Sequence, residues 1–122
     1  MSTIITTYAG TMVVHLATGL SCHGEIDIAI ADQLVADCGQ QLAELALPAG
    51  SVFVVDPSGV TFMDSAGLDA LLDLHDLVEE FDLVCVVRRA SAAVHRIVAL
   101  TAHPEQLGWL DVPNGPGLLS PA

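Results

Sequence analysis

Two short apolar runs, at residues 52–55 and 83–87, constrain the fold of this chain most strongly. They read V-F-V-V and L-V-C-V-V, which is typical of strands buried on both faces of a parallel sheet. Between them, apolar residues recur at helical spacing from about 66 to 80. A strand, a helix and a second strand in this order predict two parallel neighbours that are joined by a right-handed crossover.

The residues before the first run predict more of the same sheet and one more helix. Residues 4–8 and 12–16 are rich in Ile, Thr and Val and indicate strands, and a turn then leads to a further strand at 20–23. From about Ala29 the apolar spacing is helical until Pro48 ends the segment. The order β-β-α-β-α-β-α predicts an α/β fold, a mixed sheet with helices packed on it.

Turn residues and a proline-rich tail set the remaining boundaries. The D-P-S-G sequence at 56–59 predicts a turn after the first apolar run, and Ser91 is a good N-cap for a last helix. Prolines recur in residues 113–122, so we expect this tail to be irregular. One domain over residues 1–112, followed by the tail, accounts for the whole chain.

The charge of the chain excludes several classes of partner. Fifteen acidic residues face three arginines, no lysine is present, and the net charge is −12. Nucleic acid and anionic membrane surfaces are therefore poor partners, whereas a basic protein surface is a good one. No apolar run approaches the roughly 20 residues that span a bilayer, and the N-terminus lacks a signal-peptide pattern. We expect a cytoplasmic protein.

Neither the cysteines nor the histidines predict a metal or cofactor site. Cys22, Cys38 and Cys85 are odd in number, widely spaced and free of any C-x-x-C pair, which is typical of reduced thiols. The five histidines show no ligand spacing, so we expect no bound metal and no cofactor. A redox-gated interaction through the three thiols stays open, because spacing alone does not show which sulfur atoms approach each other.

The stretch T-F-M-D-S-A-G-L at 61–68 is the candidate functional site. It follows the first buried strand and begins a helix, and partner sites in open α/β sheets gather at this end of the strands. Either Asp64 or Ser65 is a suitable N-cap, and Gly67 allows the first turn to pack closely on the sheet. A phosphate on Ser65 would be stabilised by the helix N-terminus and repelled by nearby carboxylates, including Asp27 and Asp56, which makes a charge switch.

Three stretches of this sequence resemble a known family. G-E-I-D at 24–27, V-V-D-P-S-G-V-T-F-M-D-S-A-G-L at 54–68 and S-A-A-V-H-R at 91–96 are similar to the STAS domain of bacterial anti-sigma factor antagonists. The resemblance runs from about Thr11 to Val112 and keeps the family's order of elements. It implies a STAS-like fold for the single domain.

The resemblance also implies a function in transcription regulation. An unphosphorylated antagonist binds an anti-sigma factor that is also a serine kinase, and this frees the sigma factor. The kinase then phosphorylates a hydroxyl at the start of the helix, and a PP2C-type phosphatase restores binding. The antagonist is not an enzyme, and the family favours a monomer. The partner-binding residues implied here are Asp27, Asp56, Ser58, Asp64, Ser65, Ala66, Gly67, Asp69 and Asp73.

The chain departs from the family pattern at the phosphate acceptor. The family sequence has a second hydroxyl residue after Asp-Ser, and here that position is Ala66, which has no hydroxyl. Three interpretations follow: an antagonist that the kinase does not switch off, a phospho-acceptor moved to Ser65, or an interaction module outside sigma-factor control. We rank the moved acceptor last, because a shift of one residue turns a helix by about 100°.

The helix after Ser65 carries a second candidate surface. Asp69, Asp73, Asp76 and Glu80 follow one another at spacings of four, three and four, and form an acidic stripe suited to a basic partner. A serine hydrolase is a poor alternative, because the residues around Ser65 do not form G-x-S-x-G. A small-ligand sensor is a second alternative, although the chain has no Gly-rich phosphate loop and its net charge disfavours anionic ligands.

Overall fold

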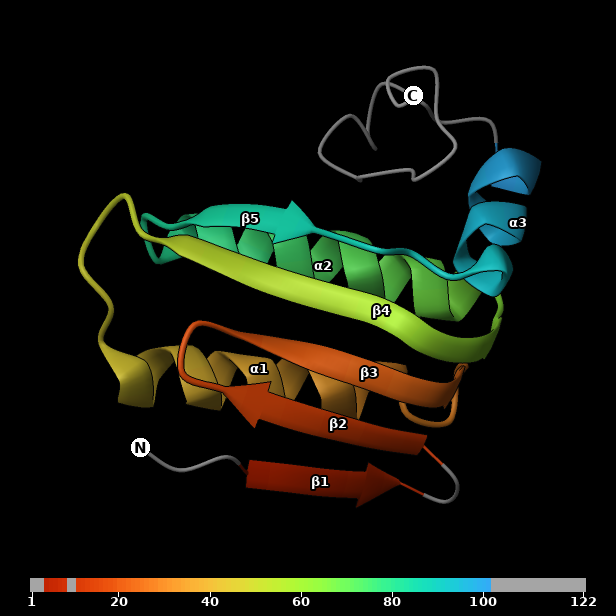
Figure 1. Cartoon of the computed structure of the whole chain (residues 1–122), viewed down its shortest axis with the longest axis horizontal. Helices are drawn as coiled ribbons and strands as arrows, with labels where there is room; N and C mark the ends of the chain where they lie inside the picture. The colour runs from red at the N-terminus through yellow and green to blue at the C-terminus, as the bar shows by residue number, and fades with distance from the viewer. Residues whose placement is uncertain (1–3, 9–10, 102–122) are drawn as a thin grey trace.

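The computed structural model describes residues 4–8 and 11–101, which form one mixed sheet and three helices (Figure 1). The sheet order is β1-β2-β3-β4-β5, with antiparallel pairs up to β3 and parallel pairs from β3 to β5. In chain order the elements are β1 (Ile4–Tyr8), β2 (Thr11–Leu16), β3 (Gly19–Ile26), α1 (Ala31–Leu45), β4 (Val52–Met63), α2 (Ser65–Glu80), β5 (Val84–Val87) and α3 (Ala92–Thr101).

The predicted α/β class and the alternation of helices and strands are confirmed. Three strands precede α1. The third is β3, and it contains the further strand that the sequence predicted at 20–23. The runs at 52–55 and 83–87 are parallel neighbours, with Val52 opposite Val84 and Val55 opposite Val87. Ser91 caps the last helix as expected, since its hydroxyl accepts a hydrogen bond from Val94 N at 3.4 Å. The tail predicted at 113–122 lies outside the described residues.

The core lies between the sheet and the helices α1 and α2, which both cover the same face of the sheet in Figure 1. The helices bury one stripe each, Leu34, Cys38 and Leu42 on α1 and Leu74 and Val78 on α2. These side chains pack against strand residues that point to the same side, of which Phe53, Val55 and Val87 are fully buried.

The prediction that the two central runs are buried on both faces is wrong. Val52 is 44% exposed and Val84 is 48% exposed, whereas their neighbours Phe53 and Cys85 are buried. Within the described residues, the connecting helices α1 and α2 lie on one face, so alternate residues of β4 and β5 face the other, open side. We call this side the open face of the sheet.

The turn predicted at 56–59 is also wrong, because β4 continues to Met63. The strand carries two extra residues relative to β3, at register shifts between Ser21 and His23 and between Gly24 and Glu25. Pro57 is tolerated in β4 because its backbone nitrogen, like that of Val55, is on the side of β5. The strand β5 ends at Val87, opposite Val55, so it offers no partner to residue 57. The missing N–H of Pro57 therefore breaks no bond of the ladder.

Candidate functional site

The start of α2 is fixed by Asp64, which is the N-cap of the helix. Its backbone is extended, at φ −106° and ψ −172°, and its Oδ1 accepts a hydrogen bond from Gly67 N at 2.9 Å. Of the two capping residues that the sequence offered, the structure selects Asp64. The Ser65 side chain is therefore not needed for capping and is exposed in the first turn.

Gly67 holds this first turn against the ends of β3 and β4, as the sequence predicted. The residue is buried, and a Cβ placed on it would lie 2.2 Å from the carbonyl oxygen of Ile26 and 2.8 Å from Cγ of Met63. Ile26 and Met63 are themselves paired across the two strands. Only a residue without a side chain lets α2 begin this close to the sheet.

Asp27 reaches the same edge of the sheet from the neighbouring strand. It directly follows Ile26, as Asp64 follows Met63, so both carboxylates leave the carboxyl ends of paired parallel strands. Its Oδ1 accepts a hydrogen bond from Ala29 N at 3.0 Å, and its carbonyl oxygen accepts bonds from Ile30 N and Ala31 N. Asp27 thereby shapes the turn into α1, beside the start of α2.

A hollow of about 260 Å³ runs between α1 and α2 and is reached by Ala66. Its apolar lining residues are Ile28, Ala31, Val35, Ala66 and Ala70. Its acidic lining residues are Asp32, Asp69 and Asp73. We call it the helix groove. Ile28 is 80% exposed, which is unusual for an isoleucine. Ala66 lines this groove, whereas Ser65 does not.

The acidic stripe predicted on α2 is exposed along its length. All four residues, Asp69, Asp73, Asp76 and Glu80, are exposed, and the first two line the helix groove. With Asp32 from α1, they make the groove strongly negative. Sequence reasoning missed Asp32 and Ile28, because nothing local shows that α1 lies beside the start of α2.

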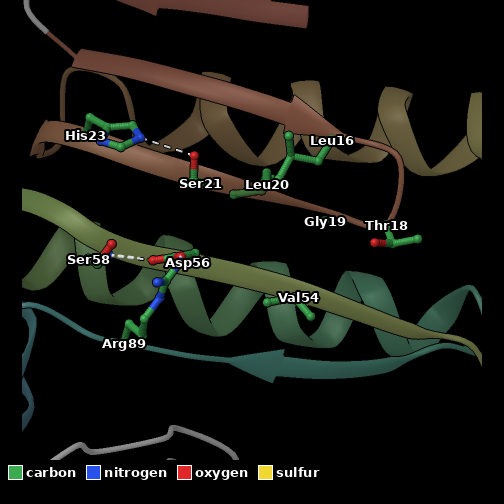
Figure 2. A pocket seen from close by; sticks show the side chains of 10 residues that line it. All are labelled: Leu16, Thr18, Gly19, Leu20, Ser21, His23, Val54, Asp56, Ser58 and Arg89. Carbon is green, nitrogen blue, oxygen red and sulfur yellow. Dashed lines mark hydrogen bonds and ion pairs between the residues drawn. The ribbon is translucent and has the colours of Figure 1, made fainter. Parts of the chain in front are cut away.

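Asp56 and Ser58, predicted as partner-binding residues, do not join this group. They lie on the open face of the sheet, in the hollow drawn in Figure 2. Asp56 Oδ1 accepts a hydrogen bond from Ser58 N at 3.0 Å, and its Oδ2 accepts one from Arg89 Nε at 3.1 Å. Burial alone would raise the pKa of Asp56, but the hydrogen bonds from Ser58 and the charge of Arg89 outweigh it and lower the pKa.

The three cysteines are buried free thiols. Burial is the main cause that raises the pKa of Cys22, Cys38 and Cys85 to about 12. Since the thiolate is the reactive form, these thiols are protected from oxidants in the folded state. Over residues 4–8 and 11–101, no group of three His, Cys, Asp or Glu side chains is arranged to hold a metal ion.

The same part of the chain contains no helix that is long and apolar enough to cross a membrane. The candidate site lies on the surface of the molecule, where Ile28, Asp69 and Asp73 are exposed. It comprises the capped start of α2, the Asp27 turn and the negatively charged helix groove. Such a surface is suited to contact with another protein, and its carboxylates favour basic residues on that partner.

Comparisons with family models and with solved structures agree on the STAS domain. A family model for the STAS domain matches residues 6–111. The crystal structure of an anti-sigma factor antagonist from Mycobacterium paratuberculosis is similar, at 27% identity and a TM-score of 0.52, over 85% of this chain and 80% of that one. No curated protein sequence matches this chain.

Two further solved structures share the fold at lower identity. The anti-sigma factor antagonist SpoIIAA in its unphosphorylated form matches at 15% identity and a TM-score of 0.55, over 91% of this chain and 88% of that one. The structure of SLC26A9 matches at 19% identity and a TM-score of 0.53, over 76% of this chain but only 17% of that chain. The same fold therefore also occurs as a small part of a much larger protein.

Proposed function

The chain belongs to the STAS domain family, and we propose that within this family it is an anti-sigma factor antagonist. In this role it binds an anti-sigma factor kinase in the cytoplasm and so releases a sigma factor. The observation that carries the proposal is the start of α2, where Asp64, Ser65 and Gly67 match the antagonist pattern in sequence and build one capped, exposed turn. The similarity to a mycobacterial antagonist over 85% of this chain supports the same role.

The proposed docking surface combines that turn with the helix groove. An apolar side chain of the partner would pack on Ile28 and Ala66, and basic side chains would meet Asp32, Asp69 and Asp73. Opposite charges across such a surface speed diffusional encounter and fix the orientation of the complex. The net charge of −12 extends the attraction beyond the contact surface itself.

We further propose that phosphorylation at the usual position does not switch this antagonist off. Ala66 occupies the acceptor position that the family resemblance implies, and it has no hydroxyl group. Ser65 is exposed but lies about 100° away around the helix and outside the helix groove. A kinase active site that is built to reach residue 66 would not bring its ATP to the Ser65 hydroxyl. A PP2C-type phosphatase would then have no substrate here.

The protein is proposed to act by binding alone, without catalysis. No hydrogen bond joins the Ser65 hydroxyl to a histidine or carboxylate within the described residues, so nothing there activates it as a nucleophile. The groups that surround it instead serve capping and packing. A monomer is sufficient for this function, because the turn and the groove come from one chain.

The test is a binding and phosphorylation assay with candidate anti-sigma factor kinases and ATP. We expect a stable complex with one of them, and intact mass spectrometry should find no added phosphate. The variants Ala66→Ser and Ser65→Ala separate the interpretations. Ala66→Ser should gain a phosphate and release the kinase, whereas Ser65→Ala should behave like the original chain. Phosphate on Ser65 would support the moved acceptor instead.

A second candidate function is an interaction module outside sigma-factor control. Two observations favour it: the missing hydroxyl at Ala66, and the similarity of the fold to a small part of SLC26A9. The same assay distinguishes the two, because this module would bind none of the anti-sigma factor kinases. A redox-gated version is disfavoured by the burial of all three thiols, and a non-reducing gel after mild oxidation would detect one.

A further inference from the structure

The open face of the sheet carries a second hollow, of about 360 Å³, between β3 and β4. It lies on the side of the sheet away from α1 and α2, as Figure 2 shows. Its polar end is formed by Ser21, His23, Ser58 and the Asp56–Arg89 pair, and its apolar end by Leu16 and Val54. The volume falls at the lower end of the range for small-molecule sites.

The backbone of the hollow is adapted to hold His23. The His23 Nε2 atom lies 3.1 Å from Ser21 Oγ, and the ring packs directly on Gly59. A Cβ at residue 59 would lie 2.2 Å from His23 Nδ1, so only glycine allows the ring to occupy this place. The extra residue of β4 lies at the same point of the register, between the partners of Ser21 and His23. Bulges of this kind often re-aim side chains beside binding sites.

Arg89 is held in a strained backbone conformation at the other wall. Its φ is +58°, in the left-handed region that arginine rarely adopts. Its Nε and Nη2 atoms both donate to Asp56 Oδ2, while the side chain remains 76% exposed. Nη1 has no hydrogen-bond partner in the portion of the chain that the structure describes. The guanidinium group is therefore fixed in direction and still able to donate.

One of the few cations of this acidic chain, Arg89, lines this hollow. The chain has only three basic residues besides its histidines, Arg88, Arg89 and Arg96, and all of them fall within nine consecutive positions. The net charge of −12 argued against anionic ligands for the protein as a whole. At this hollow, however, an anion meets the Arg89 guanidinium group and stays on the far side of the sheet from the helix groove.

We propose that this hollow binds a small monocarboxylate with a short apolar chain. The carboxylate accepts hydrogen bonds from Arg89 Nη1 and the Ser58 hydroxyl, since planar guanidinium groups match carboxylates well. The apolar chain lies along Val54 and Leu16. Asp56 already neutralises part of the Arg89 charge, so a singly charged group fits better than a phosphate. A cationic ligand would be repelled by Arg89. The site is independent of the proposed antagonist function.

The test is a titration of the protein with sodium hexanoate, in which NMR measures the amide chemical shifts at each ligand concentration. We expect saturable shifts centred on Ser21, His23 and Ser58, with a dissociation constant on the order of 1 mM for a ligand of this size. 1-Hexanol lacks the charge and acetate lacks the chain, so each should bind at least roughly tenfold more weakly.

Matched variants assign the effect to Arg89. Arg89→Gln should weaken hexanoate binding roughly tenfold or more. The control Arg96→Gln makes the same change of charge at an exposed position of α3, and it should leave the dissociation constant within about twofold. Ser58→Ala is the second variant, and it decides the matter if Arg89→Gln lacks a dispersed amide spectrum. Shifts that do not saturate, equal binding of 1-hexanol, or no effect of either pocket variant would overturn the proposal.

Discussion

The close contact at Gly67 gives a sharp prediction about the substitution Gly67→Ala. The added methyl would lie 2.2 Å from the Ile26 carbonyl oxygen, more than 1 Å short of the 3.4 Å at which ordinary contact begins. Because this oxygen belongs to the backbone of β3, either the strand or the start of α2 must move. Overpacking of this kind costs about 1–3 kcal/mol, and alanine offsets it by at most about 1 kcal/mol through its helix propensity.

Urea denaturation followed by circular dichroism measures the outcome against a matched control. We expect Gly67→Ala to lose up to about 2 kcal/mol of unfolding free energy. Gly39→Ala makes the same chemical change inside α1, where the new methyl meets only Cδ2 of Leu77 at an ordinary 3.5 Å. It should therefore gain about 0.5–1 kcal/mol. If Gly67→Ala were as stable as Gly39→Ala, the account of how α2 is seated on the sheet would be refuted.

Three further predictions follow from the site and the core. Asp64→Ala should destabilise the fold by about 1 kcal/mol in the same urea assay, whereas Asp64→Asn, which still caps, should lose much less; equal losses would mean that the cap hydrogen bond to Gly67 is unimportant. Asp73→Lys should slow association with the anti-sigma partner roughly two- to tenfold in stopped-flow measurements and weaken its dependence on salt, while Glu44→Lys, with the same charge change on α1, should do so much less. Because burial raises their pKa values, the three thiols contribute to the free energy of unfolding in full below pH 9. This contribution is lost between pH 9 and about 12, because the thiols of the unfolded chain release their protons at lower pH than those of the folded chain. The slope should be up to about 1.4 kcal/mol per pH unit for each thiol, and a variant with all three cysteines changed to alanine should lack that loss.

The helices and the site at α2 were predictable because their signals are local. Helical spacing of apolar residues depends on the chain within one or two turns, and it placed the helix at 66–80 to within a residue or two. The N-cap expected at Ser91 likewise marked the start of the last helix. Asp64 and Gly67 act on each other and on the adjoining strand end, so their roles could be inferred from a stretch of eight letters. The choice between Asp64 and Ser65 as the cap needed the structure, and so did the position of Asp32 and Ile28 beside the start of α2.

The open face of the sheet was missed because an apolar run does not show what covers it. V-F-V-V reads the same whether helices pack on one side or on both, and only the side taken by the connecting helices decides this. The turn predicted at 56–59 failed for a related reason. D-P-S-G has the composition of a turn, but pairing with β3 keeps the segment extended, and Pro57 falls just past the end of β5.

The hollow on the open face needed information that no local pattern contains. Arg89 meets Asp56 across 33 positions of sequence, and the contact depends on the parallel register of β4 and β5. His23 reaches its place through a bulge in a strand that the sequence predicted to have ended. Spacing rules do not predict contacts that depend on strand register. For this reason the sequence assigned Asp56 and Ser58 to the site at the start of α2, whereas the structure places them on the open face.

The most direct test of the central claim is the state of the complex after incubation with its anti-sigma factor kinase and ATP. Size-exclusion chromatography would measure the complex, and intact mass spectrometry would measure phosphate on the protein. The account predicts a complex that persists in ATP with no phosphate added, and a complex of Ala66→Ser that gains phosphate and dissociates. A phosphate on the original chain that dissociates the complex, or no complex with any such kinase, would contradict it.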